Sequence, residues 1–245
     1  MLEKIVGGEH SPIVLVDFAM FSTADTMTGL MGVPETGRAV YRVDAVQGLE
    51  LHGHMSVKHL ADLYGRKIER LESAPAAVLG YCGAATLALE IAGRLGDLQI
   101  VLVEPTWPTT DLIGLELAHL RGTLGASGAP PAEITRDSVL ATLTGDLTTK
   151  LAAEGMPESE LDTSVEMLTD RYRAWFVLLF ATAEAAVPTP ARPVSLVVAR
   201  DSDRGPAPGW TATDCELVRV DVPAGEFLGS SATRERILGL VGRRG

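Results

Sequence analysis

The sequence is poor in cysteine, in cationic side chains and in long apolar runs, and each shortage excludes a class of protein. Its 245 residues include two cysteines, Cys82 and Cys215, which lie too far apart to indicate a disulfide framework. Lys and Arg number 21 against 32 Asp and Glu, and the net charge of −11 argues against nonspecific binding to nucleic acids. No run of eighteen apolar residues is present, so no membrane span is expected.

Two further absences concern targeting and metals. The first residues, Met1 to Lys4, carry no secretory signal pattern, which predicts a cytoplasmic protein. None of the histidines has metal-ligand spacing to a cysteine or to a second histidine on a defined element, so we predict no metal. His52 and His54 fall in a predicted loop over 44–54, where they either border an active site or simply lie at the surface.

The apolar pattern alternates between strands and helices. Residues 13–16, 99–103 and 194–198 are short apolar runs typical of strands buried on both faces, and 40–43 is another candidate strand. Residues 217–222 alternate apolar and charged side chains, as an edge strand does. Helices are predicted after a Ser56 cap, up to Leu95 and over 230–242. Strands and helices joined by short turns predict one α/β domain over 1–245 with a mostly parallel sheet.

The pattern changes over residues 109–187, where no strand is predicted. Helices are expected from Leu112, near 135–154 and over 158–186. We interpret this block as a helical insertion within the domain, either a lid over an active site or a docking subdomain. Its apolar stripe, which includes Trp175, is explained equally well by core packing.

The stretch from Ala76 to Ala92 carries the clearest chemical signal. An apolar run leads into Gly80-Tyr81-Cys82-Gly83-Ala84, and a helical pattern follows. This is the strand–turn–helix of a nucleophile elbow, which normally reads Gly-x-Ser-x-Gly. Cys82 occupies the nucleophile position, and the amide of Gly83 is placed to stabilise an oxyanion. A small buried hydrophobe in a turn is the alternative interpretation of Cys82.

With these residues, the chain resembles an α/β-hydrolase, and within that fold it is similar to the thioesterases of nonribosomal peptide and polyketide pathways. The resemblance rests on residues 60–92, 194–203 and 222–227. It implies that Cys82 is the nucleophile and that the acid is Glu104 or, after the next strand, Asp203 or Asp201. It implies a histidine in the turn Ala224-Gly225-Glu226-Phe227, where this chain has Glu226.

Other parts of the site follow from the same resemblance. The glycine-rich oxyanion loop is replaced by Asp17-Phe18-Ala19-Met20-Phe21, so Ala19 and Met20 are the candidates at that place. Tyr81, Trp107 and Trp175 are candidates for lining an acyl channel, although aromatic residues under a lid are as often plain core. No cofactor of the protein's own is implied, because the substrate is expected on the phosphopantetheine arm of an acyl or peptidyl carrier protein acting in trans.

The missing histidine matters less to a cysteine than to a serine. A serine hydroxyl needs a base to take its proton, whereas a cysteine has a few per cent of nucleophilic thiolate at neutral pH. Hydrolysis needs an activated water, for which Glu226 is the candidate base. We therefore predict acyl transfer or cyclisation through Cys82 rather than simple hydrolysis.

Two alternatives stay open. In the first, the same scaffold catalyses a cyclisation or rearrangement in which Glu104, Asp203 or Glu226 act as acid and base, and Cys82 is dispensable. In the second, the protein is a hydrolase that has lost its catalytic function and serves as a binding partner.

Overall fold

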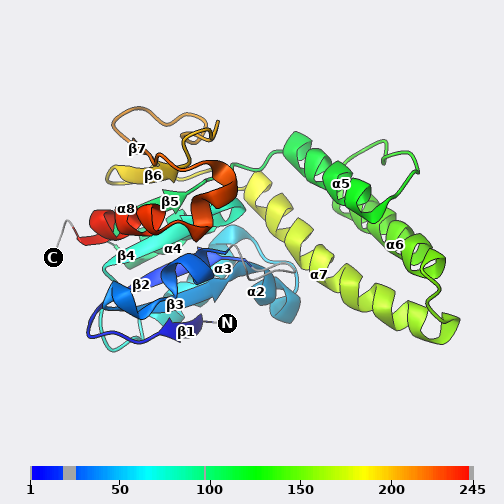
Figure 1. Cartoon of the computed structure of the whole chain (residues 1–245), viewed down its shortest axis with the longest axis horizontal. Helices are drawn as coiled ribbons and strands as arrows, with labels where there is room; N and C mark the ends of the chain where they lie inside the picture. Colours follow the sequence, from blue (N-terminus) through cyan, green and yellow to red (C-terminus); the bar gives the residue numbers. More distant parts are fainter. Residues whose placement is uncertain (1, 19–25, 97, 243–245) are drawn as a thin grey trace.

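The computed structural model describes residues 2–18, 26–96 and 98–242, apart from the side chain of Glu35. Its centre is a seven-stranded sheet in the order β1-β3-β2-β4-β5-β6-β7 (Figure 1). The strands are β1 (Leu2–Val6), β2 (His10–Asp17), β3 (Arg38–Asp44), β4 (Ala77–Tyr81), β5 (Gln99–Val103), β6 (Val194–Val198) and β7 (Cys215–Arg219). All neighbouring strands pair in parallel except β1, which runs antiparallel to β3.

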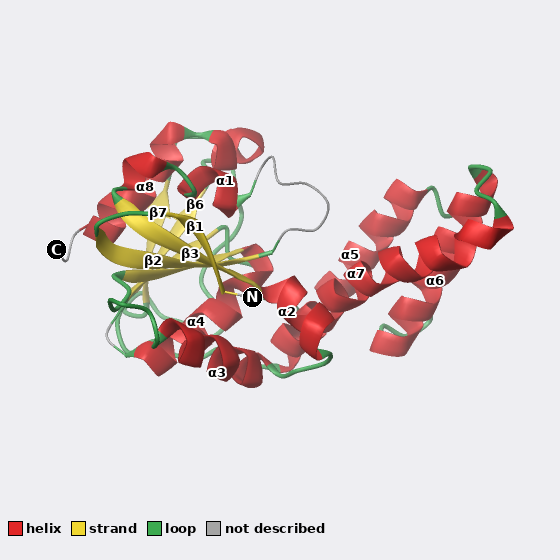
Figure 2. Cartoon of the chain, turned by 90° about the horizontal axis from the view of Figure 1, so that it is seen from below, coloured by secondary structure: helices red, strands yellow, loops and turns green. Residues whose placement is uncertain are grey.

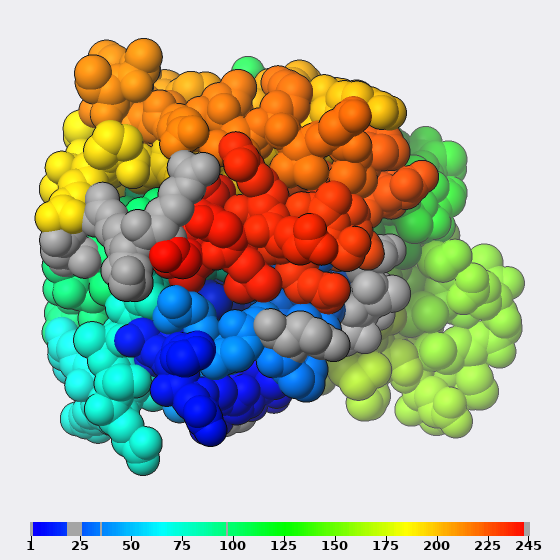
Figure 3. Space-filling model, turned by 60° about the vertical axis from the view of Figure 1, so that its left-hand side comes forward, coloured from blue at the N-terminus to red at the C-terminus, as the bar shows by residue number. Residues whose placement is uncertain are grey.

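Helices cover both faces of the sheet (Figure 2). One face packs against α2 (Ala45–His52), α3 (Val57–Ile68) and α4 (Ala85–Leu95), and the other packs against α1 (Met27–Met31) and α8 (Ser231–Val241). Alternate residues of one strand serve opposite faces, since Val14 and Val16 belong to the first core and Ile13 and Leu15 to the second. Figure 3 shows the side of the molecule on which the C-terminal segment that contains α8 (red) is exposed beside the N-terminal segment (blue).

A helical arm is inserted between β5 and β6. It consists of α5 (Thr110–Leu124), α6 (Arg136–Ala153) and α7 (Glu158–Glu184), and Figures 1 and 2 both show it projecting beyond the sheet. The three helices share a small core that includes Ile113, Leu143 and Phe176. The C-terminal half of α7 also packs into the core of the sheet through Ala174, Leu178 and Ala181. The helix α7, about 40 Å long at 1.5 Å per residue, therefore joins the arm to the part of the chain that contains the sheet.

Most predicted elements are present, and four differ from the prediction. The short helix α1 was not predicted. The segment 44–54, predicted as a loop, is mostly the helix α2, which is capped by the Asp44 side chain. A Cβ at Gly48 would collide with the Tyr64 hydroxyl, so the packing of α3 against α2 requires glycine. The edge strand β7 covers Cys215–Arg219, earlier than the predicted 217–222. The partly exposed strand β1 was not predicted.

Three short 3₁₀ turns complete the described chain: Pro34–Thr36, Cys82–Ala84 and Ala224–Gly229. Within the described residues, every helix is too short or too polar to traverse a lipid bilayer.

Candidate active site

The turn after β4 has the geometry of a nucleophile elbow. Cys82 lies between β4 and α4 with a φ of +48°, a left-handed backbone conformation that non-glycine residues rarely adopt. Gly80 permits this turn, because a Cβ there would lie 2.6 Å from Ala88 Cβ and 2.9 Å from Leu102 Cδ2. Backbone strain of this kind costs on the order of 1–3 kcal/mol and is concentrated at functional sites. The local geometry therefore makes Cys82 the candidate functional residue of this turn.

Thr106, which was not predicted, fixes the cysteine from the segment that follows the neighbouring strand β5. Its backbone amide donates to the Cys82 carbonyl at 3.2 Å, and its hydroxyl lies 3.4 Å from Cys82 Sγ. The hydroxyl can donate to a thiolate or accept from a thiol, so this contact survives a change in the protonation of the sulfur.

Glu104, the first residue after β5, also has a left-handed backbone, with a φ of +47°. Its Oε1 accepts the Ala199 amide at 2.6 Å, and its Oε2 accepts the Ser202 hydroxyl at 2.8 Å. The Arg204 Nε lies 3.2 Å from the same Oε2, and the Glu104 side chain is only 13% exposed. The carboxylate is thus fully engaged and ties the end of β5 to the loop that follows β6.

Arg204 connects this carboxylate to the sulfur. Its Nη1 donates to Cys82 Sγ at 3.8 Å and to the Glu104 carbonyl at 3.4 Å. The side chain is 36% exposed, so it is reachable from solvent while being held at three points. Arg204 was not predicted as a site residue. The available signal was a cation directly after Asp201-Ser202-Asp203, in the loop that follows a buried strand.

A cavity of about 330 Å³ opens beside Cys82. Its lining residues come from the ends of β4, β5 and β6 and from the turn after β7: Tyr81, Cys82, Glu104, Asp201, Ser202, Asp203, Arg204, Ala224, Phe227 and Leu228. The structure therefore brings together five of the predicted site residues, Tyr81, Cys82, Glu104, Asp201 and Asp203, and the side chains of both aspartates are exposed. Asp201 is held by accepting the Ala224 amide at 2.9 Å.

Glu226 lies apart from these groups. It sits in the exposed part of the turn Ala224–Gly229, and the cavity is lined by its neighbours Ala224, Phe227 and Leu228 instead. All five histidines lie within the described residues, all are exposed, and none of them lines the cavity. His54 contacts Arg136 of the arm at 2.9 Å. No group of three metal-ligating side chains occurs in the part of the chain that the structure describes.

The predicted aromatic residues divide between the cavity and the core. Tyr81 lines the cavity, and burial raises the pKa of its phenol to about 12, so it is neutral at physiological pH. Trp175 stacks on Phe18 at 4.3 Å between ring centroids and packs close above Gly83, whose absent Cβ would lie 3.6 Å from its ring. Trp107 donates to the Gly205 carbonyl at 3.0 Å and is not a lining residue.

Buried charges support the start of the predicted oxyanion loop. Asp17, at the end of β2, is fully buried and accepts from Arg42 Nε at 2.6 Å and from Thr28 at 3.1 Å. Burial raises the pKa of Asp17, against the attraction of Arg42. The candidates Ala19 and Met20 lie outside the described residues.

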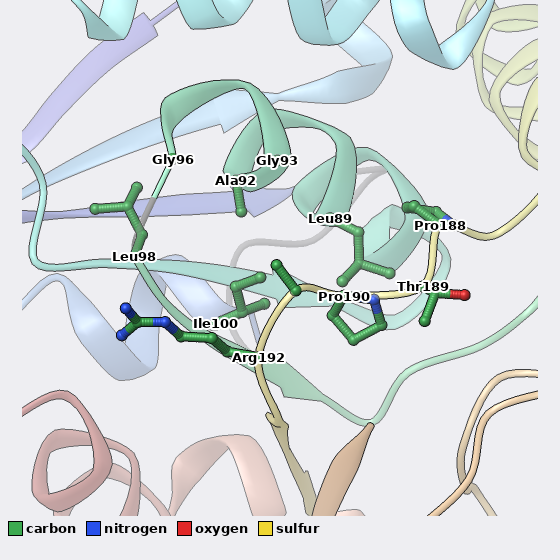
Figure 4. Close-up of a pocket in the computed structure, with 11 residues that line it drawn as sticks. Leu89, Ala92, Gly93, Gly96, Leu98, Ile100, Pro188, Thr189, Pro190 and Arg192 are labelled. Atoms are coloured by element: carbon green, nitrogen blue, oxygen red, sulfur yellow. The ribbon is translucent and has the colours of Figure 1, made fainter. Parts of the chain in front are cut away.

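A second cavity lies at the far end of α4, between that helix and residues 188–192 (Figure 4). It measures about 340 Å³ and is lined mainly by apolar and small residues, among them Leu89, Leu98 and Ile100. The elbow is at the start of the same helix, whereas this cavity is lined by residues of the helix from Leu89 onward. Because no cysteine or serine lines this second cavity, the candidate active site is the one at Cys82.

Comparison with known proteins supports the fold. No protein-family model and no curated protein matches the sequence. Among solved structures, the NocB thioesterase domain, in covalent complex with a fluorophosphonate nocardicin G analogue, matches with a TM-score of 0.55 and 16% identity over 99% of this chain and 100% of that chain. YbtT, a type II thioesterase from the yersiniabactin NRPS/PKS biosynthetic pathway, matches with a TM-score of 0.61 and 15% identity over 98% and 96%.

A larger protein gives the same result. A four-domain nonribosomal peptide synthetase, AB3403, matches with a TM-score of 0.61 and 16% identity over 98% of this chain and 20% of that chain. The predicted fold, a mostly parallel sheet flanked by helices as in thioesterase α/β-hydrolases, is confirmed.

Proposed function

We propose that this protein is a thioesterase-type enzyme that takes an acyl or peptidyl group from a carrier-protein thioester onto Cys82. The observation that carries the proposal is the left-handed elbow at Cys82, whose sulfur faces a cavity on a fold shared with thioesterase domains. Cysteine is the one side chain in this cavity that is a competent nucleophile without a neighbouring base.

The proposed reaction has two steps. The Cys82 thiolate attacks the carbonyl carbon of the substrate thioester, and the collapse of the intermediate expels the phosphopantetheine thiolate and leaves an acyl-Cys82 thioester. A second nucleophile then attacks the same carbonyl and restores the Cys82 thiolate. When that nucleophile belongs to the acyl chain itself, the product is a ring, and when it is external, the result is acyl transfer.

The other predicted residues take supporting roles in this proposal. Glu104 has its carboxylate engaged by Ala199, Ser202 and Arg204, so we assign it to positioning rather than to proton transfer. Gly83 supplies an oxyanion donor, and Trp175 of α7 packs above it, which favours a role for the arm beside the acyl group. The carrier protein would act in trans.

Intact-protein mass spectrometry after incubation with simple acyl thioesters tests the proposal. We expect one added acyl mass on the wild type and on the matched control Cys215→Ala, and none on Cys82→Ala. Cys215 is the appropriate control because it is the second cysteine and is buried in β7. Equal labelling of Cys82→Ala, or no labelling of the wild type by any thioester, would overturn the proposal in favour of the carboxylate-driven or non-catalytic alternatives.

A further inference from the structure

A histidine-dependent hydrolase links a carboxylate to the ring and the ring to the nucleophile. In this structure the corresponding chain of contacts is Glu104, Arg204 and Cys82. The Glu104 Oε2 lies 3.2 Å from Arg204 Nε, and Arg204 Nη1 lies 3.8 Å from Cys82 Sγ. An arginine therefore stands between acid and nucleophile, where a base would otherwise be expected.

Arginine changes the chemistry that this position can perform. Its guanidinium has five donors and no acceptor and stays protonated in proteins, so it cannot take a proton from water or from a thiol. It can hold negative charge on a sulfur or an oxygen beside it, and charge-assisted hydrogen bonds are the stronger kind. Glu104 and its carbonyl fix the guanidinium, so little reorganisation is needed when that charge develops.

We infer that Arg204 is a catalytic residue that stabilises the thiolates entering and leaving the site, and that it directs acyl-Cys82 to thiol acceptors rather than to water. This inference rests on the proposed function, and it names the acceptor class. Both thiol steps balance without a base: a thiolate attacks the acyl carbonyl, the C–S bond to the other sulfur breaks, and the electron pair leaves with that sulfur. The site thus moves acyl groups between sulfurs.

Hydrolysis would require a proton acceptor, and neither Arg204 nor the fully engaged Glu104 provides one. Water must lose a proton as it attacks, and the Glu104 carboxylate already binds three donors. Asp201 and Asp203 are both exposed on the cavity wall, and Asp201 accepts the Ala224 amide through its Oδ1, so Asp203 is the carboxylate chosen for the test. Asp203→Asn is therefore included in the test, because a hydrolytic site would depend on it.

The test follows the acyl-enzyme in the full-length protein. Wild type is acylated with an acyl thioester, separated from excess reagent and followed by intact mass in buffer alone or with pantetheine as the thiol acceptor. We expect pantetheine at millimolar concentration to discharge acyl-Cys82 at least about tenfold faster than buffer. Arg204→Met should slow both acylation and discharge about tenfold or more, the scale of a lost charge-assisted hydrogen bond. Arg204→Lys should retain more activity than Arg204→Met.

Arg200→Met is the matched control, because it removes the same charge from the same loop. Arg200 is 58% exposed and pairs with Asp221 instead of Cys82. Arg200→Met should behave as wild type. Melting temperatures identify any variant that fails to fold; Glu104 keeps its bonds to Ala199 and Ser202 when Arg204 is replaced.

The outcomes separate the inference from the proposed function. If Arg204→Met is acylated and discharged as fast as wild type, the inference is wrong. It is also wrong if buffer discharges acyl-Cys82 of the wild type as fast as pantetheine does and Asp203→Asn abolishes the discharge in buffer. In both cases the nucleophilic role of Cys82 stands. If wild type forms no acyl-enzyme, the proposed function fails. The rate of Cys82 alkylation by iodoacetamide then still tests Arg204: a rate unchanged in Arg204→Met overturns its role, and a rate lowered about tenfold supports it.

Discussion

Because the backbone is strained at the elbow, Cys82→Gly should be more stable than Cys82→Ala, which reverses the usual order of glycine and alanine variants. With a φ of +48°, residue 82 is in the region where an L-residue costs about 1–2 kcal/mol and glycine costs almost nothing. Glycine loses about 0.5–1 kcal/mol of this advantage, because its unfolded chain is freer. Both variants lack the sulfur, so the lost contacts to Thr106 and Arg204 cancel. The net difference is about 1 kcal/mol in favour of glycine.

Urea denaturation and calorimetry of the two variants measure this difference. A stability gain of 1 kcal/mol raises the melting temperature of a domain of this size by roughly 2–4 °C. The same pair of substitutions at Cys215 provides the control, because that residue begins the strand β7. There the glycine variant should be the less stable by about 0.5–1 kcal/mol. If Cys82→Gly proves no more stable than Cys82→Ala, the left-handed backbone at residue 82 stores no strain and does not indicate a functional position.

Three further predictions concern the site and its support. Gly80→Ala, which places a methyl group 2.6 Å from Ala88 Cβ, should destabilise the fold by about 1–3 kcal/mol in urea titrations; an unchanged midpoint would show that the turn has room to spare. Arg42→Met leaves the buried carboxylate of Asp17 without its partner and should lower the free energy of unfolding by about 3–5 kcal/mol. The double variant with Asp17→Asn should recover most of this loss. Equal stability of the single and double variants would contradict the pairing. The pKa of Tyr81 in the folded state is raised from 10.0 to about 12, so its contribution to stability is complete below pH 10 and is lost as the pH rises through 12. Tyr81→Phe should therefore reduce the loss of stability at alkaline pH. A difference spectrum in which the Tyr81 phenol ionises near pH 10 would refute this.

Local patterns in the sequence determined most of the fold. Apolar runs at 13–16, 99–103 and 194–198 are strands, and the helical periodicity over 158–186 is the helix α7. The elbow was also legible, because a strand, a glycine-flanked turn and a helix are consecutive in the chain. These features depend on residues a few positions apart, which is the range over which periodicity and turn chemistry act.

Local patterns failed where packing overrode propensity. The helix α2 contains Gly48, which costs helix stability by itself and is required only because Tyr64 of α3 packs against it. Trp107 follows a strand that ends at the site, yet its indole turns to the loop at Gly205 and Trp210. Neither outcome is visible before the partner segment is in place.

The sequence alone determined that a cysteine lies in a strand–turn–helix within a mostly parallel α/β domain, because those features are local. Only the tertiary structure decided which groups surround the sulfur. Thr106 is 24 positions from Cys82 and Arg204 is 122 positions away, and both reach it because parallel strands end at one edge of the sheet. The same geometry leaves Glu226 outside the cavity, since a turn exposes some of its side chains and buries others.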